Sequence, residues 1–369
     1  MFTQQIRPTK TAHRIGLLLL LAMLLAGCTS GSLLSGSSWP GLTIDDETAY
    51  IAYSNALYAV DQNTGYENWR FPLEVERALS FFAAPALSDD GMLVIGSYAN
   101  ILYGLRDLGG QVDSVWTFDD AGDRYIGSPV IVDDLVLAPN ADGHLYALNL
   151  ETGRTEWIYA ASSGNALWSA PLVVENHAFL TSLDHELYCI DISNGAECWK
   201  QDLGAAIAST PASYDDHLLV GTFGEELFAV SIEDGSILWI FETEGWIWGT
   251  PAVAGDVAFI TDLSGILYAI DLTNEGEEIW RQTLDGPVTA APIVDDARVY
   301  AISEIGSVYA FEQATGVPAW PRTTAIEGTL NANAVLKEGT LYIPATGSEC
   351  LLFAVDSDAG SIRCEFQPE

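Results

Sequence analysis

Basic residues are scarce in this 369-residue chain: 14 Lys and Arg stand against 51 Asp and Glu, a formal net charge of −37. Only three residues are lysine, Lys10, Lys200 and Lys337. A field of this sign repels phosphate backbones, which argues against nucleic acid as a partner. The composition suits an acidic body that meets salt or a basic partner, and a salt-adapted host is compatible with it.

The chain also lacks the motifs of common catalytic and metal sites. It contains no Gly-x-Ser-x-Gly, no His-Glu-x-x-His and no Walker loop. The loops 61–65 and 356–360 resemble calcium loops but lack the downstream bidentate acid. Four histidines lie one per region in predicted turns: His144, His177, His185 and His217. We therefore expect no enzyme activity, no catalytic residue, no metal and no cofactor.

The only long apolar run is at the N-terminus, and its flanks are those of an export signal. Three basic residues precede the apolar residues 15–25, and Leu-Ala-Gly-Cys ends at Cys28. This order resembles the lipobox of bacterial lipoproteins, which implies cleavage before Cys28 and a lipid on its thiol. An ordinary signal peptide with a chance cysteine is the alternative. Residues 29–38, mostly Ser, Gly, Thr and Leu, are predicted to be a flexible tether.

A phrase of the form Leu-Tyr-Ala-x-Asp, then a Gly-bearing turn and a Trp, recurs along the rest of the chain. Its first residue stands at 57, 102, 145, 187, 227, 267, 308 and 352, so the steps are 45, 43, 42, 40, 40, 41 and 44 residues. The eighth copy has Cys364 at the spacing where Trp is expected. The other seven copies end on a tryptophan: Trp69, Trp116, Trp157, Trp199, Trp239, Trp280 and Trp320.

Each copy contains four short apolar runs separated by turn residues, with no helical period. The runs barely alternate in polarity, so both faces of each small sheet must be covered. Such a unit, repeated about every forty residues, is typical of a propeller blade. We therefore predict an all-β fold, one eight-bladed β-propeller of four-stranded antiparallel blades over residues 39–369, with each copy complete in its own blade.

The repeat phrase has a known counterpart. Residues 145–157 carry Leu-Tyr-Ala-x-Asn-x-x-Thr-Gly-x-x-x-Trp, which resembles the repeat of quinoprotein (PQQ-type) propellers. Eight such copies behind a lipobox resemble the BamB family of outer-membrane protein assembly lipoproteins, over about nine-tenths of the chain. That resemblance implies a non-catalytic scaffold in the cell envelope, lipid-anchored to a membrane, that binds protein partners such as an assembly component or an unfolded client.

Other functions are weighed against this one. Small-ligand sensing or PQQ-dependent redox chemistry is the first alternative. Quinone enzymes of this superfamily typically carry an adjacent Cys–Cys pair and a calcium cage, and none of the five cysteines here is adjacent to another. A surface lipoprotein of a cell that has no outer membrane is a further alternative.

The tryptophans and cysteines are interpreted as structural. One indole per blade fills the wedge between neighbouring sheets. Besides Cys28, four cysteines remain in an exported chain, which favours disulfides. Cys189 and Cys198 flank one hairpin turn, so a bond between them is predicted. Cys350 and Cys364 flank the last hairpin in a different register and are a second candidate pair, with free buried thiols as the alternative.

An up-and-down blade also predicts two unlike faces. The turns between strands one and two carry acidic pairs, interpreted first as soluble turn residues and second as a surface for a basic partner or a cation. The pairs are Asp45-Asp46, Asp89-Asp90, Asp133-Asp134, Asp215-Asp216 and Asp295-Asp296.

The blade-to-blade links on the opposite face carry large residues beside the central channel. Three positions before the proline of each link stand Phe82, Ile126, Trp168, Ala208, Trp248 and Thr289. Exposed aromatic and arginine side chains are typical anchors of a protein interface, with a channel plug as the alternative. The predicted partner-binding rim is Phe81, Phe82, Tyr125, Trp168, Trp246, Trp248, Arg77 and Arg124. Arg322 is placed in the same links, where Glu242 and Glu244 are further candidates to pair with these arginines. We expect a monomer.

Overall fold

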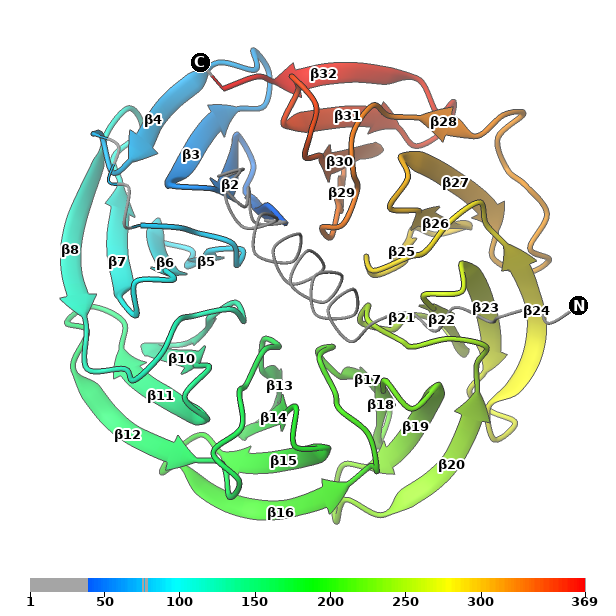
Figure 1. Cartoon of the computed structure of the whole chain (residues 1–369), viewed down its shortest axis with the longest axis horizontal. Coiled ribbons are helices and arrows are strands. Elements are labelled where there is room, and N and C mark those ends of the chain that lie inside the picture. Colours follow the sequence, from blue (N-terminus) through cyan, green and yellow to red (C-terminus); the bar gives the residue numbers. More distant parts are fainter. Residues whose placement is uncertain (1–38, 75, 77–78, 369) are drawn as a thin grey trace, which may run out of the picture. The chain divides into compact units, whose positions relative to one another are not determined.

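The computed structural model describes residues 39–74, 76 and 79–368, and within them it contains strands and no helix (Figure 1). Accordingly, none of these residues belongs to a helix that could cross a membrane. The predicted signal segment 1–28 with Cys28, the tether 29–38 and Arg77 lie outside the described residues.

The strands form eight four-stranded antiparallel sheets, each built from four consecutive strands. The sheets surround a central axis, with the first strand of each sheet innermost and the fourth at the periphery (Figure 1). The predicted all-β, eight-bladed propeller is therefore confirmed. Blades one to four comprise β1 (Gly41–Ile44), β2 (Thr48–Tyr53), β3 (Ala56–Asp61), β4 (Glu67–Phe71); β5 (Ala86–Leu87), β6 (Met92–Gly96), β7 (Leu102–Asp107), β8 (Val112–Phe118); β9 (Val130–Val132), β10 (Leu135–Pro139), β11 (His144–Asn149), β12 (Thr155–Ala160); and β13 (Leu172–Val174), β14 (His177–Thr181), β15 (Glu186–Asp191), β16 (Ala196–Asp202). Blades five to eight comprise β17 (Ala212–Tyr214), β18 (His217–Gly221), β19 (Glu226–Ser231), β20 (Ile237–Glu242); β21 (Ala252–Ala254), β22 (Val257–Thr261), β23 (Ile266–Asp271), β24 (Glu277–Thr283); β25 (Ile293–Val294), β26 (Arg298–Ile302), β27 (Ser307–Glu312), β28 (Thr324–Ala325); and β29 (Val335–Lys337), β30 (Thr340–Pro344), β31 (Leu352–Asp356), β32 (Ile362–Phe366).

Packing between neighbouring blades explains why the apolar runs barely alternate. Eight apolar clusters fill the structure, and each takes its side chains from two adjacent blades. The second and third strands of a blade therefore contribute residues to a cluster on each side, and both of their faces are buried. In β2 and β3, for example, Ile51 and Leu57 are both fully buried although they belong to different clusters.

The ring closes by side-chain packing, with no strand exchanged between blades one and eight in the described residues. One of the apolar clusters joins the two ends of the chain and includes Leu42 and Ile51 of blade one with Tyr342 and Phe366 of blade eight. The ammonium of Lys337 also lies 2.9 Å from a carboxylate oxygen of Asp46. Each copy is thus complete in its own blade, as its spacing predicts.

The repeat tryptophans act together with the glycines of the next blade. The Trp116 indole N–H donates to the Leu150 carbonyl at 2.7 Å, in the last turn of blade three. A Cβ built on Gly153 of that same turn would lie 2.6 Å from the Trp116 ring. Gly153 also has a φ of +65°, which L-residues rarely adopt. The glycine is therefore required by its own backbone and by the tryptophan of the neighbouring blade.

One of the two predicted cysteine pairs is bonded and the other is not. A disulfide joins Cys350 to Cys364, whereas Cys189 and Cys198 are free, so the bond predicted between them is absent. The strand pair is bulged at this point: Cys189 is opposite Trp199, and Cys198 falls at the extra position. Burial and a hydrogen bond with Cys198 raise the pKa of Cys189, which therefore remains a thiol at neutral pH.

Two other predictions also need correction. His144, His177 and His217 are the first residues of β11, β14 and β18 and do not lie inside turns, unlike His185. Cys364 is opposite Phe353, one place beyond the register of the repeat tryptophan, because the bulge of blade eight is shifted along β31. Spacing along the chain cannot reveal such a shift.

Candidate protein-binding site at the mouth of the central channel

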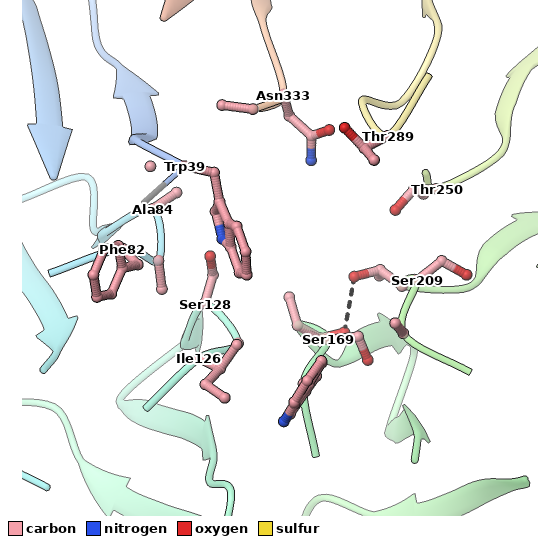
Figure 2. Close-up of a pocket in the computed structure, with 18 of the residues that line it drawn as sticks. Trp39, Phe82, Ala84, Ile126, Ser128, Ser169, Ser209, Thr250, Thr289 and Asn333 are labelled. Carbon is pink, nitrogen blue, oxygen red and sulfur yellow. Dashed lines mark hydrogen bonds between the residues drawn. The ribbon is translucent and has the colours of Figure 1, made fainter. Parts of the chain in front are cut away.

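The links between blades form the wall of a central cavity of about 270 Å³. Residues from the start of every blade line it, among them Trp39 in blade one and Asn333 in blade eight. Figure 2 shows Phe82 and Ile126 on one side of this cavity and Thr250 and Thr289 on the other. All six residues that stand three positions before a link proline line the cavity: Phe82, Ile126, Trp168, Ala208, Trp248 and Thr289.

Small residues in the links let adjacent blades approach closely around the cavity. A Cβ on Gly127 would lie 2.7 Å from the Ser169 carbonyl oxygen, and one on Gly249 would lie 2.8 Å from the Ala290 carbonyl oxygen. Backbone atoms cannot move aside as a flexible side chain can. The small residue two positions before each link proline therefore lets the backbones of adjacent blades lie close together at the cavity wall.

The wall combines polar and apolar side chains and carries no charge. One of its hydroxyl groups, that of Ser169, bonds to the Thr181 hydroxyl at 2.5 Å, whereas the Thr289 hydroxyl is buried without a partner among the described residues. Thr181 in turn donates to the Ser209 carbonyl, and Thr210 donates to the Ala170 carbonyl at 3.1 Å. None of the described residues that line the cavity is Asp, Glu, Lys or Arg. This donor set does not fit a calcium ion, which takes carboxylate ligands, or an anionic quinone that needs cationic partners.

Two aromatic clusters lie at this end of the molecule. In the first, Phe223 is stacked between Trp246 and Trp248, with ring centroids 5.2 and 5.0 Å away. Trp246 remains 47% exposed. In the second, the ring centroids of Phe82 and Tyr98 are 4.2 Å apart, and the guanidinium of Arg124 lies 5.3 Å from the centre of the Tyr98 ring. Stacked rings that remain partly exposed to solvent are suited to binding apolar groups of a partner.

Sequence reasoning missed Tyr98 and Phe223. Both lie in the turn between the second and third strands of their blades, and the backbone N–H of each donates to a carbonyl of the preceding link, Ser80 for Tyr98 at 2.8 Å and Ala206 for Phe223 at 2.9 Å. The repeat carries the signal that could have found them, because both occupy the same place in their copies.

Some predicted rim residues are not at the surface. Phe81 and Tyr125 are fully buried, each in a cluster between two blades. The links are extended there, so successive side chains point in opposite directions, and the following residues Phe82 and Ile126 face the cavity instead. Phe81 and Tyr125 therefore belong to the core between blades, and neither is among the residues that line the central cavity.

The arginines are also distributed differently from the prediction. Arg322 lies between β27 and β28 beside Gln282 and Tyr309, away from the links that line the cavity. Glu244 pairs with Arg281 at 2.8 Å. Of the predicted rim arginines within the described residues, Arg124 is the one near the aromatic clusters.

The acidic pairs lie in the turns between first and second strands, as predicted. Several of their carboxylates serve the turn itself. Asp45 accepts hydrogen bonds from the N–H groups of Glu47 and Thr48, and Asp295 accepts them from Ala297 and Arg298. These contacts support the turn-residue interpretation of the acidic face.

A half-buried carboxylate, that of Asp142, connects a turn of the rim to a link. Asp142 accepts hydrogen bonds from the Tyr146 hydroxyl at 2.6 Å, the Gly122 N–H at 2.7 Å and the His144 N–H at 3.0 Å. Burial acts to raise the pKa of Asp142, but these bonds outweigh it and hold the pKa below its ordinary value.

Replacing Asp142 by asparagine should therefore destabilise the fold by about 1–3 kcal/mol at neutral pH. The native pKa is the lower one, so the carboxylate stabilises the fold above its unfolded pKa, near 3.9, and this stabilisation is lost as the pH falls through the native pKa. Urea unfolding at neutral pH and near pH 3 measures the free energy of unfolding of the variant and of wild type. The difference between the two should be smaller near pH 3. The exposed Asp120→Asn is the control, and a difference equal at both pH values contradicts the assignment.

Comparison with known families agrees with this architecture. A family model described as "Outer membrane protein assembly factor BamB" matches residues 26–182, 159–247 and 229–366. The chain belongs to this family. Three proteins of that same name are similar to it, from Legionella pneumophila (35% identity over 83 residues, 20% of this chain and 22% of the relative), Shewanella oneidensis (26% over 159 residues, 39% and 38%) and Yersinia pestis (24% over 311 residues, 82% and 70%). The first two alignments span well under two thirds of the relatives' own length.

Solved structures share the fold of this BamB family member. The crystal structure of BamB from Moraxella catarrhalis superposes with a TM-score of 0.68 at 18% identity, over 82% of this chain and 90% of that one. The computationally designed Ika8 protein superposes with a TM-score of 0.71 at 14% identity, over 88% and 95%. At such identities the likeness concerns the propeller alone.

Proposed function

We propose that this protein is a non-catalytic scaffold of the cell envelope, anchored by a lipid on Cys28, that binds a protein partner in outer-membrane protein assembly. The family membership supports the assembly role, since the printed name of the related proteins is that of an assembly factor. The binding surface is the pair of aromatic clusters at the mouth of the cavity.

The stack of Trp246, Phe223 and Trp248 is the observation that carries the proposal. Protein interfaces concentrate their binding energy in a few tryptophan, tyrosine and arginine residues. Trp246 is the most exposed tryptophan of the described residues, at 47%, and Phe223 supports its ring at 5.2 Å. An indole that is half exposed and held in place by a neighbouring ring loses little conformational entropy on binding.

A small-ligand function has less support. The cavity volume of about 270 Å³ is slightly below the roughly 300–1,000 Å³ of usual ligand pockets. Some wall hydroxyls are already hydrogen-bonded, as between Thr210 and the Ala170 carbonyl at 3.1 Å, whereas the Thr289 hydroxyl and the Asn331 side-chain oxygen are buried without a partner among the described residues. No titratable pair faces the cavity from its described lining residues, so a proton-transfer role has no donor.

Affinity capture from detergent-solubilised envelopes tests the proposal. Trp246→Ala and Trp248→Ala should each weaken capture of an outer-membrane assembly protein by about 30-fold, the effect of losing a contact worth about 2 kcal/mol. Leu238→Ala is a matched control, because Leu238 is 46% exposed but lies on β20 at the periphery. Mass spectrometry of the propeller protein itself, purified in the same experiment, should find an acylated Cys28 at its N-terminus.

Capture that is unchanged in both tryptophan variants, with melting temperatures equal to wild type, would contradict the binding surface. Capture that Leu238→Ala weakens as strongly would move the surface to the periphery of the ring. An unmodified Cys28 would contradict the anchor.

A further inference from the structure

Three side chains of the kind that bind transition metals converge on one face of blade four. His177 begins β14, Cys189 lies in β15 and Cys198 lies in β16 (Figure 1). One ligand atom from each, an imidazole nitrogen or a sulfur, lies within 4.8 Å of the other two. Cys189 is 2% exposed, Cys198 is exposed and His177 is half-buried. The cluster is thus anchored in the core on one side and open to solvent on the other.

Sheet register explains the convergence. His177 is opposite Asp191 and Phe179 is opposite Cys189, so His177 and Cys189 are diagonal neighbours on the same face. Cys198 reaches this face because the bulge in β16 makes it the extra residue between the partners of Cys189 and Ile190. Bulges often redirect a side chain in this way.

The cluster departs from the repeat at its two cysteine positions. The place of Cys189 is held by a small residue in every other blade: Ala59, Gly104, Ala147, Ala229, Ala269, Ala310 and Ala354. Blade five has a histidine at the place of His177, namely His217, but Ala229 and Leu238 stand where blade four has its cysteines. Since alanine meets the packing requirement elsewhere, the thiols of blade four are not explained by the fold.

We propose that His177, Cys189 and Cys198 bind one thiophilic transition metal ion, for which Zn²⁺ is the probe. Two thiolates and one imidazole are a recognised zinc donor set, and a fourth position on the solvent side would be left to water or to a group of a partner. Binding requires no oxidant or reductant: two sulfur–metal bonds and one nitrogen–metal bond form, and the two thiol protons pass to solvent. The carboxylate of Asp191, opposite His177, adds negative charge beside the ion.

The test uses the full chain, purified with reductant under argon and then freed of metal and reductant. Competition with a chromophoric chelator should show one tight Zn²⁺ per chain. Because the acidic surface binds divalent ions weakly through carboxylates, Co²⁺ provides the specific readout, a thiolate-to-metal charge-transfer band. Cys189→Ala, which installs the residue usual in the other blades, should abolish the band and weaken Zn²⁺ binding by at least about 100-fold, more than the loss of an outer-shell partner.

His177→Ala and Cys198→Ala should weaken binding in the same way, while His217→Ala is the matched control and should leave it unchanged. The proposal is overturned if reduced protein shows no charge-transfer band, or if Cys189→Ala binds Zn²⁺ like wild type. It is equally overturned if cells lysed in an alkylating reagent yield a Cys189–Cys198 disulfide. None of these three outcomes depends on whether the rim binds a protein partner.

Discussion

Replacing Trp116 by alanine should lower the free energy of unfolding by about 3–5 kcal/mol, the range for a buried aromatic removed from a core. The Trp116 ring lies between blades two and three, 9% exposed. It fills the space beside Gly104 and Gly153, where an added Cβ would come within 2.1 and 2.6 Å of it. Alanine would leave this space empty and would also deprive the Leu150 carbonyl of its 2.7 Å hydrogen bond.

Urea unfolding followed by tryptophan fluorescence and circular dichroism measures this loss. Trp246→Ala serves as the control, since that ring is half exposed and its removal should change stability by about 0.5 kcal/mol or less. Equal losses in the two variants would contradict the assignment of Trp116 as the spacer between two blades. Gly104→Ala tests the same space by adding volume instead of removing it. Overpacking beside the Trp116 ring should lower the free energy of unfolding by about 1–3 kcal/mol.

Removing the disulfide of blade eight should cost about 3 kcal/mol, the value expected for a loop of about fifteen residues. Cys350 and Cys364 are 14 residues apart, and their bond joins the last strand to the segment before β31. Blade eight has no tryptophan in the register that blades one to six use, since Arg363 is opposite Ala354. The covalent bond holds the terminal strand where no indole can.

The double variant Cys350→Ser, Cys364→Ser should therefore have a lower urea midpoint than wild type, and dithiothreitol should lower the wild-type midpoint to nearly the same value. Leu238→Ala is the control and should behave like wild type, because Leu238 is 46% exposed at the periphery. A double variant as stable as wild type would show that Phe366, 5.5 Å from Tyr58 of blade one, secures the last strand without the bond.

Most of the fold follows from spacing. Eight copies at nearly equal steps, each with four short runs, leave few arrangements other than a ring of small sheets. The burial of both faces follows from the lack of alternation, and fully buried residues such as Ile51 and Leu57 agree with it. The site followed only in part. The position three before each link proline marks the cavity wall, since it is a property of the repeat.

The rest of the site depends on contacts between copies. Phe81 and Phe82 are adjacent in the chain and chemically alike, yet Phe81 is fully buried while Phe82 lines the cavity. The burial of these two side chains differs because successive side chains of an extended link point alternately into the interface between blades and toward the channel. Phe223 enters the rim because a turn of blade five lies beside the next link, and no periodicity within one copy reports which neighbour it meets.

Repetition along the chain is sufficient to decide the number of blades, the order of their strands and the completeness of each blade, because each unit folds largely from its own residues and stacks on an equivalent one. The places where a copy departs from the repeat are different. The shifted bulge in blade eight, the free thiols of blade four and the stacked rings around Phe223 each depend on a displacement of about one residue or on a neighbouring blade. These are differences of register and packing, which arise only when the strands pair and the ring closes.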